Sequence, residues 1–186
     1  LIASGPAFAG VNSIYRTALS AMLPAQPTAR VYEKGYLPKI TDIGNRHPVT
    51  ENLEQFSPSF GSDEDTPWGR WFRHIDAEPK SGSVVMTGVD DRPLLLLDRV
   101  GEGRIAMLLS DQAWLWSRGF EGGGPQLELL RRLAHWMMKE PELEEERLTA
   151  TAVGQNVTIV RRSLADENRP VTLETPDGKE LQLTLE

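Results

Sequence analysis

The chain has no cysteine, only three histidines, no long hydrophobic run and no excess of basic charge. The absence of cysteine excludes disulfide bonds, thiolate metal sites and cysteine nucleophiles. No apolar run reaches the roughly 18 residues that a membrane-spanning helix needs, and we expect no signal peptide within this segment. We therefore expect no direct membrane insertion by this segment.

Acidic residues outnumber basic ones, with 27 Asp and Glu against 20 Lys and Arg, which gives a net charge of −7. Nucleic acids and anionic membrane surfaces attract concentrated basic faces, so neither is an expected partner. A hydrophobic content of 39% and a charged content of 25% are typical of a folded globular protein. The length of 186 residues suits one domain, or one domain with a small appendage.

Residues 1–147 alternate between strand and helix patterns, which predicts an α/β domain. Strands are expected at 1–5, 29–32, 84–88, 93–100 and 104–111, and helices at 13–23 and 125–139. The apolar run Ile105–Leu109 is continuous, as in a strand that is covered on both faces. Residues 51–82 carry the least regular pattern.

Residues 148–186 have a different composition, with four short strand patterns, at 148–153, 156–162, 170–175 and 180–185, separated by turn residues. They predict an antiparallel β extension, or a truncated β-sandwich. Both Leu1–Gly5 and Leu181–Glu186 have strand patterns without a start or stop signal. We therefore expect both ends to be cut from a longer protein.

Polar and glycine residues follow the strand at 104–111, where open α/β sheets place their ligands. The sequence predicts a ligand cleft there, and its expected lining is Ser110, Asp111, Trp114, Arg118, Gly122, Gly123 and Gly124. The glycine run before a helix can bind an anion through free backbone N–H groups. A flexible turn is the simpler interpretation, because no P-loop Lys or Ser/Thr follows.

Catalytic and metal-binding patterns are weak. A hydrolase could use Ser110 and Asp111 with His47 or His74, but no G-x-S-x-G elbow surrounds the serine. His135 falls on the polar stripe of its predicted helix. Asp63–Asp65 are consecutive and lack the spacing of a calcium loop. No metal site and no cofactor is expected.

Four tryptophans offer a stacking platform for a carbohydrate, or a packed core, which is the default interpretation. They are Trp68, Trp71, Trp114 and Trp116. Trp114 and Trp116 alternate around Leu115, so one of them is expected to be buried and the other exposed.

Several segments together resemble a known family. They are Leu1–Gly10, Tyr15–Pro24, the His-Pro stretch His47–Leu53, Gly103–Ala106, Asp111–Trp114, and the loop Arg118–Gly124 with the helix that leads to Pro141. The first 147 residues resemble the glutamine-amidotransferase-like domain of large bacterial membrane proteins of uncharacterised function.

The resemblance implies a flavodoxin-like fold with a partly parallel sheet and flanking helices, whose early strands lie upstream of Leu1. It also implies a soluble domain of a membrane-anchored cell-envelope protein, on an unknown side of the membrane. Its partners would be other domains of that protein or other envelope proteins. Class I amidotransferases use a cysteine, aided by His and Glu, on the turn after their third strand.

At the matching turn this chain has Gly5–Gly10, with Ala7 near the nucleophile position. Alanine cannot attack a carbonyl group, so no catalytic residue is expected. The sequence therefore favours a non-catalytic binding or assembly module. The alternatives are the hydrolase described above and a structural spacer, which would be favoured if aromatic residues around Trp68 and Trp71 fill the cleft.

Overall fold

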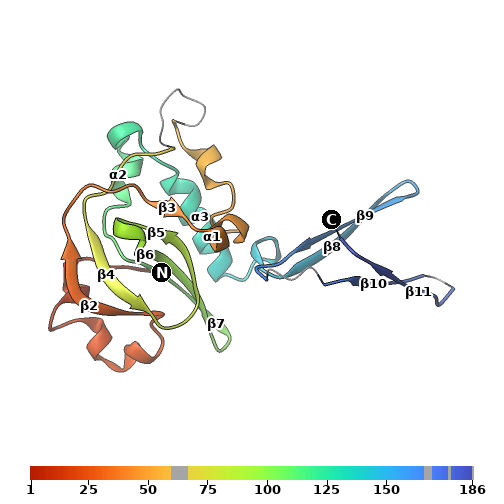
Figure 1. The fold of residues 1–186 in the computed structure, drawn as a ribbon, viewed down its shortest axis with the longest axis horizontal. Helices are drawn as coiled ribbons and strands as arrows, with labels where there is room; N and C mark the ends of the chain where they lie inside the picture. Colours follow the sequence, from red (N-terminus) through yellow and green to blue (C-terminus); the bar gives the residue numbers. More distant parts are fainter. Residues whose placement is uncertain (60–66, 166–168, 176, 186) are drawn as a thin grey trace. The chain divides into compact units, whose positions relative to one another are not determined.

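The computed structural model describes residues 1–59, 67–165, 169–175 and 177–185 (Figure 1). The chain forms two compact units, Leu1–Leu143 and Glu144–Glu186. This division lies slightly before the boundary expected at residue 147. The acidic segment Asp63–Asp65 lies outside the described residues.

The first unit is built on a five-stranded sheet in the order β1-β7-β6-β5-β3. Its strands are β1 (Ile2–Ala3), β3 (Lys39–Ile40), β5 (Ser83–Thr87), β6 (Pro93–Val100) and β7 (Gly103–Leu108). β1 pairs in parallel with β7, and the other three pairings are antiparallel. The unit is therefore α/β, with a mostly antiparallel and partly parallel sheet.

Short connections explain why antiparallel pairing dominates. Gly101 lies in the turn between β6 and β7 with a φ of 56°, which glycine adopts without strain. A parallel pair needs a crossover of about a dozen residues or more, and neither the β5–β6 nor the β6–β7 connection has that length. The sequence-based expectation of a partly parallel sheet holds for the β1–β7 pair.

Side chains cover both faces of this sheet. Leu94–Leu97 of β6 are all buried, and Leu96 packs in a different cluster from Leu95 and Leu97. One cluster contains Trp68, Trp71 and Trp116, together with the buried side chains of the helix α3 (Gln126–Met137). The other contains residues of the antiparallel pair β2 (Ala25–Tyr32) and β4 (His74–Pro79). β6 is thus covered on both faces. The same holds for β7, as its continuous apolar run predicts, because Ala106 and Leu108 lie in the first cluster and Met107 and Leu109 in the second.

The helix expected at residues 13–23 is wrong. Two 3₁₀ helices, η2 (Ile14–Arg16) and η3 (Ala18–Ala21), are separated at Thr17, whose backbone is extended. The Thr17 hydroxyl donates to the Ile14 carbonyl at 2.7 Å and accepts from the Leu19 N–H at 3.2 Å. Such local hydrogen bonds compete with a continuous α-helix.

The remaining helices of the first unit are short. They are α1 (Asp42–Arg46), α2 (Trp114–Ser117), η1 (Pro6–Ala9), η4 (Leu53–Phe56), η5 (Val89–Asp91), η6 (Phe120–Gly122) and η7 (Pro141–Leu143). No helix within the described residues is long and apolar enough to span a membrane.

The second unit consists of two antiparallel hairpins. β8 (Arg147–Val153) pairs with β9 (Asn156–Arg162), and β10 (Val171–Glu174) pairs with β11 (Glu180–Leu183). All four strands lie where the sequence pattern predicts them.

Helix α3 is the longest helix and matches its sequence pattern. It buries Leu129, Leu133 and Trp136. Glu128, whose side chain is 15% exposed, accepts hydrogen bonds from Arg131 at 2.8 Å and Arg132 at 2.6 Å. These arginines lower the pKa of Glu128 to about 2.

This ion cluster makes stability depend on pH. Because the folded pKa of Glu128 lies below its ordinary value, the stabilisation is complete above about pH 4.5 and is lost as the pH falls toward 2. We expect Glu128→Gln to remove up to about 3 kcal/mol of that pH-dependent stability. Urea denaturation at pH 6, 4 and 2.5 measures it. The exposed Glu102→Gln is the control, and an equal change in both variants would contradict the assignment.

Candidate functional site

The carboxyl ends of β1 and β7 lie at the same edge of the sheet because these strands are parallel. Ser4 and Gly5 follow β1, and Ser110 and Asp111 follow β7 closely. A Cβ atom on Gly5 would lie 3.1 Å from the Asp111 carboxylate, so the two chain segments are in contact. The start of β4 joins them, since the Ile75 N–H donates to the Leu109 carbonyl at 2.9 Å.

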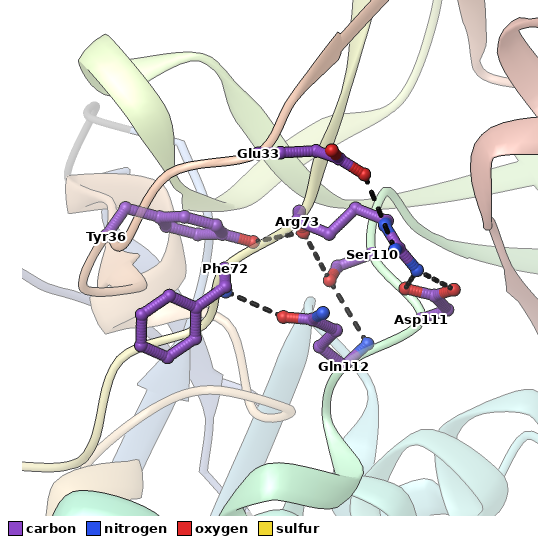
Figure 2. A network of polar contacts seen from close by, with 7 residues as sticks. All are labelled: Glu33, Tyr36, Phe72, Arg73, Ser110, Asp111 and Gln112. Carbon is purple, nitrogen blue, oxygen red and sulfur yellow. Dashed lines mark hydrogen bonds and ion pairs between the residues drawn. The ribbon is translucent and has the colours of Figure 1, made fainter.

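Hydrogen bonds fix the chain on both sides of this edge (Figure 2). The Arg73 carbonyl accepts from the Ser110 hydroxyl at 2.7 Å and from the Tyr36 hydroxyl at 3.0 Å. The Phe72 N–H donates to Gln112 Oε1 at 2.6 Å, and the Gln112 N–H donates to Ser110 Oγ at 3.2 Å. Burial raises the pKa of Tyr36, so its hydroxyl stays protonated and remains a donor.

The charged part of the site is a triad of Glu33, Arg73 and Asp111, drawn in Figure 2. Arg73 Nη1 lies 3.1 Å from Asp111 Oδ2, and Arg73 Nη2 lies 3.5 Å from Glu33 Oε1. The side chain of Arg73 is 32% exposed, that of Asp111 is 37% exposed and that of Glu33 is 69% exposed. The triad carries two negative charges and one positive charge at a solvent-accessible edge of the sheet.

Two further polar atoms at this edge are buried. Within the described residues, Ser4 Oγ and Arg73 Nε have no hydrogen-bond partner. Buried polar groups normally have partners, so these two atoms offer a donor or acceptor that the described residues leave unused.

The structure brings no histidine to Ser110 within the described residues. The serine hydroxyl is directed to the Arg73 carbonyl. His74 is buried, which lowers its pKa; its Nε2 lies 2.7 Å from the Pro93 carbonyl and its Nδ1 accepts from the Val89 N–H. His47 Nδ1 accepts from the Val49 N–H, and His135 Nδ1 lies 2.6 Å from Glu140. None of the three histidines therefore stands as a general base beside Ser110.

The turn after β1 forms the 3₁₀ helix η1. Phe8 is buried in it, while Ala7 is exposed and offers no reactive side chain. No group of three or more His, Cys, Asp or Glu residues able to hold a metal is found in the described ranges.

The glycine run has a packing role that the sequence did not reveal. A Cβ atom on Gly124 would lie 2.5 Å from the indole ring of Trp116, and the Gly123 carbonyl accepts from the Gly69 N–H at 2.8 Å. The Gly69 carbonyl accepts from Trp116 Nε1 at 2.8 Å. Gly122 is exposed. Gly124 therefore leaves room for the Trp116 ring, and a Cβ atom on Gly123 would lie 2.9 Å from the Trp116 backbone carbonyl.

The four tryptophans do not form a shared platform. Trp68, Trp71 and Trp116 are buried, with ring centroids 5.1 Å apart for Trp68–Trp116 and 4.7 Å for Trp71–Trp116. Trp114 is 52% exposed, so the expectation that one of Trp114 and Trp116 is buried is confirmed. Arg118 is exposed on the segment after α2. Of the expected cleft residues, Ser110 and Asp111 take part in the hydrogen bonds and ion pairs around Arg73. Gly123 and Gly124 instead pack against Trp116.

Sequence reasoning did not find Glu33, Tyr36, Arg73 or Gln112. Arg73 directly precedes β4, a strand whose pattern is hidden by the buried polar residues His74 and Asp76. No sequence pattern singles out Arg73, because the strand that it precedes does not have an alternating pattern.

Comparisons with protein-family models, with curated proteins and with solved structures found no match for this chain.

Proposed function

We propose that the first unit is a non-catalytic glutamine-amidotransferase-like domain that acts as a binding or assembly module of a membrane-anchored bacterial envelope protein. Its fold would be a variant of the flavodoxin-like arrangement. The parallel β1–β7 pair, with α3 packed beside it, supports this relationship. The antiparallel pairings of β3, β5 and β6 depart from it.

One observation carries the proposal: the edge at which an amidotransferase would react holds a charged, solvent-accessible triad, and among the described residues it holds no activated nucleophile. Ala7 stands on the turn after β1, and the Ser110 proton is directed to a backbone carbonyl. The Glu33–Arg73–Asp111 triad is suited to polar contacts with another protein surface.

A glutaminase assay tests the non-catalytic half of the proposal. We expect the purified chain to release no ammonia from glutamine above the rate of buffer alone, because the Ser110 hydroxyl donates to a backbone carbonyl and has no histidine beside it. Ser110→Ala is the matched variant. Glutamine turnover that disappears in Ser110→Ala would overturn the proposal and favour the hydrolase.

Photo-crosslinking in the intact parent protein tests the binding half. A photoreactive amino acid replaces Glu33 in the triad or, as control, Glu102 in the exposed turn that precedes β7 at the opposite end of the strand. We expect crosslinks to another domain or envelope protein from position 33 and none from position 102. The absence of crosslinks from position 33, or equal crosslinks from both positions, would contradict a binding role for this edge.

A structural spacer is the second candidate. It is favoured by the packing of Trp68, Trp71 and Trp116 under Gly124, which fills the glycine side of the expected cleft. A spacer predicts no crosslink from Glu33, so the same experiment separates the two functions.

A further inference from the structure

The second unit contains a cavity with an unusual concentration of arginine. Its volume is about 500 Å³, and its lining includes Arg147, Arg161, Arg162 and Arg169, together with Thr172. These are all the arginines of residues 144–186, a segment in which acidic residues outnumber basic ones. A segment with a negative net charge thus collects its arginines around one space.

Local structure builds this cavity from the ends of both hairpins. Arg161 Nη1 donates to the Arg169 carbonyl at 3.0 Å, which ties the end of β9 to the segment before β10. Glu146, the acidic residue of the lining, accepts hydrogen bonds from the Ser163 hydroxyl at 2.7 Å and the Leu164 N–H at 3.2 Å. Its carboxylate therefore holds the chain after β9, and the lining contains four arginines and this one glutamate.

The strand register adds an independent observation. Arg147 and Arg162 are direct partners across the β8–β9 hairpin. Like charges directly opposite one another in an antiparallel pair are destabilising. Within the described residues, the Arg147 side chain makes no hydrogen bond or ion pair. An anion in the cavity would relieve this repulsion.

We propose that this cavity binds a phosphate group. Guanidinium groups donate in a planar fork that matches phosphate oxygens. The volume lies in the range of about 300–1,000 Å³ that is usual for small-molecule sites. Two sources share this chemistry, a free phosphate compound and a phospholipid headgroup.

The test measures binding of pyrophosphate by titration calorimetry and binding to phosphatidylglycerol vesicles by sedimentation, with phosphatidylcholine vesicles as the neutral reference. Arg147→Gln is the variant. Removing this charge relieves the repulsion with Arg162, so we expect the hairpin to stay folded. Lys179→Gln is the matched control, since Lys179 is the one basic residue of this segment that the cavity lining lacks. Circular dichroism verifies that both variants keep their β structure.

We expect saturable binding that Arg147→Gln weakens by about tenfold and Lys179→Gln leaves within about twofold. Pyrophosphate binding with this pattern assigns a free phosphate ligand. Binding confined to phosphatidylglycerol vesicles, with the same pattern, assigns a lipid headgroup. No binding of either probe, or equal weakening by both substitutions, overturns the proposal.

Discussion

Replacing Gly124 by alanine is expected to lower the free energy of unfolding of the first unit by about 3 kcal/mol. The added Cβ atom would lie 2.5 Å from two atoms of the Trp116 ring. That ring cannot move aside, because it is 1% exposed, packs against Trp68 and Trp71, and donates a hydrogen bond to the Gly69 carbonyl. The substitution must therefore displace either the tryptophan cluster or the start of α3.

Tryptophan fluorescence during urea denaturation measures this loss, and the native emission spectrum shows whether the cluster has rearranged. Gly103→Ala is the matched control, because its Cβ atom would meet only the Val100 carbonyl, at 3.4 Å. We expect the control to be neutral or to gain up to about 1 kcal/mol from a less flexible unfolded chain. If both variants are equally stable, Gly124 does not have the packing role assigned to it.

Replacing Arg92 by methionine is expected to cost about 3 kcal/mol at pH 7, because it leaves a buried carboxylate without its counter-charge. The Asp76 side chain is 2% exposed, and its Oδ1 lies 2.8 Å from Arg92 Nη1. Its Oδ2 accepts from the Thr28 hydroxyl at 2.6 Å. The hydroxyl alone cannot balance a buried negative charge.

The double variant Asp76→Asn with Arg92→Met separates charge from packing. An asparagine oxygen can still accept from Thr28, so we expect the double variant to recover part of the lost stability. Arg118→Met, at an exposed position, should change the free energy of unfolding by less than about 0.5 kcal/mol. Losses that simply add in the double variant would show that Asp76 and Arg92 are not energetically coupled.

The central hairpins could be predicted from the sequence because their information is local. Leu94–Leu97 and Ile105–Leu109 are continuous apolar runs joined by the turn at Gly101, and the structure places β6 and β7 there. The pattern of α3 is equally direct, since Leu129, Leu133 and Trp136 repeat at helical spacing. Each of these patterns lies within a short stretch of sequence, either one hairpin or a few turns of helix.

β4 could not be predicted, because its first four residues are buried although His74 and Asp76 are polar. Their partners come from elsewhere in the chain, with Val89 and Pro93 at His74 and Thr28 and Arg92 at Asp76. A strand that buries satisfied polar groups loses the alternation by which strands are recognised.

The sequence by itself determined that no thiol chemistry is possible, where the hairpins and the long helix lie, and that Ser110 and Asp111 follow a buried strand. Only the tertiary structure decided that β1 lies parallel to β7 and that Arg73 meets Asp111 across 38 positions of chain. It also decided that Gly124 packs against the Trp116 ring and that four arginines line one cavity. Such contacts depend on which distant surfaces pack together, and no short sequence pattern records them.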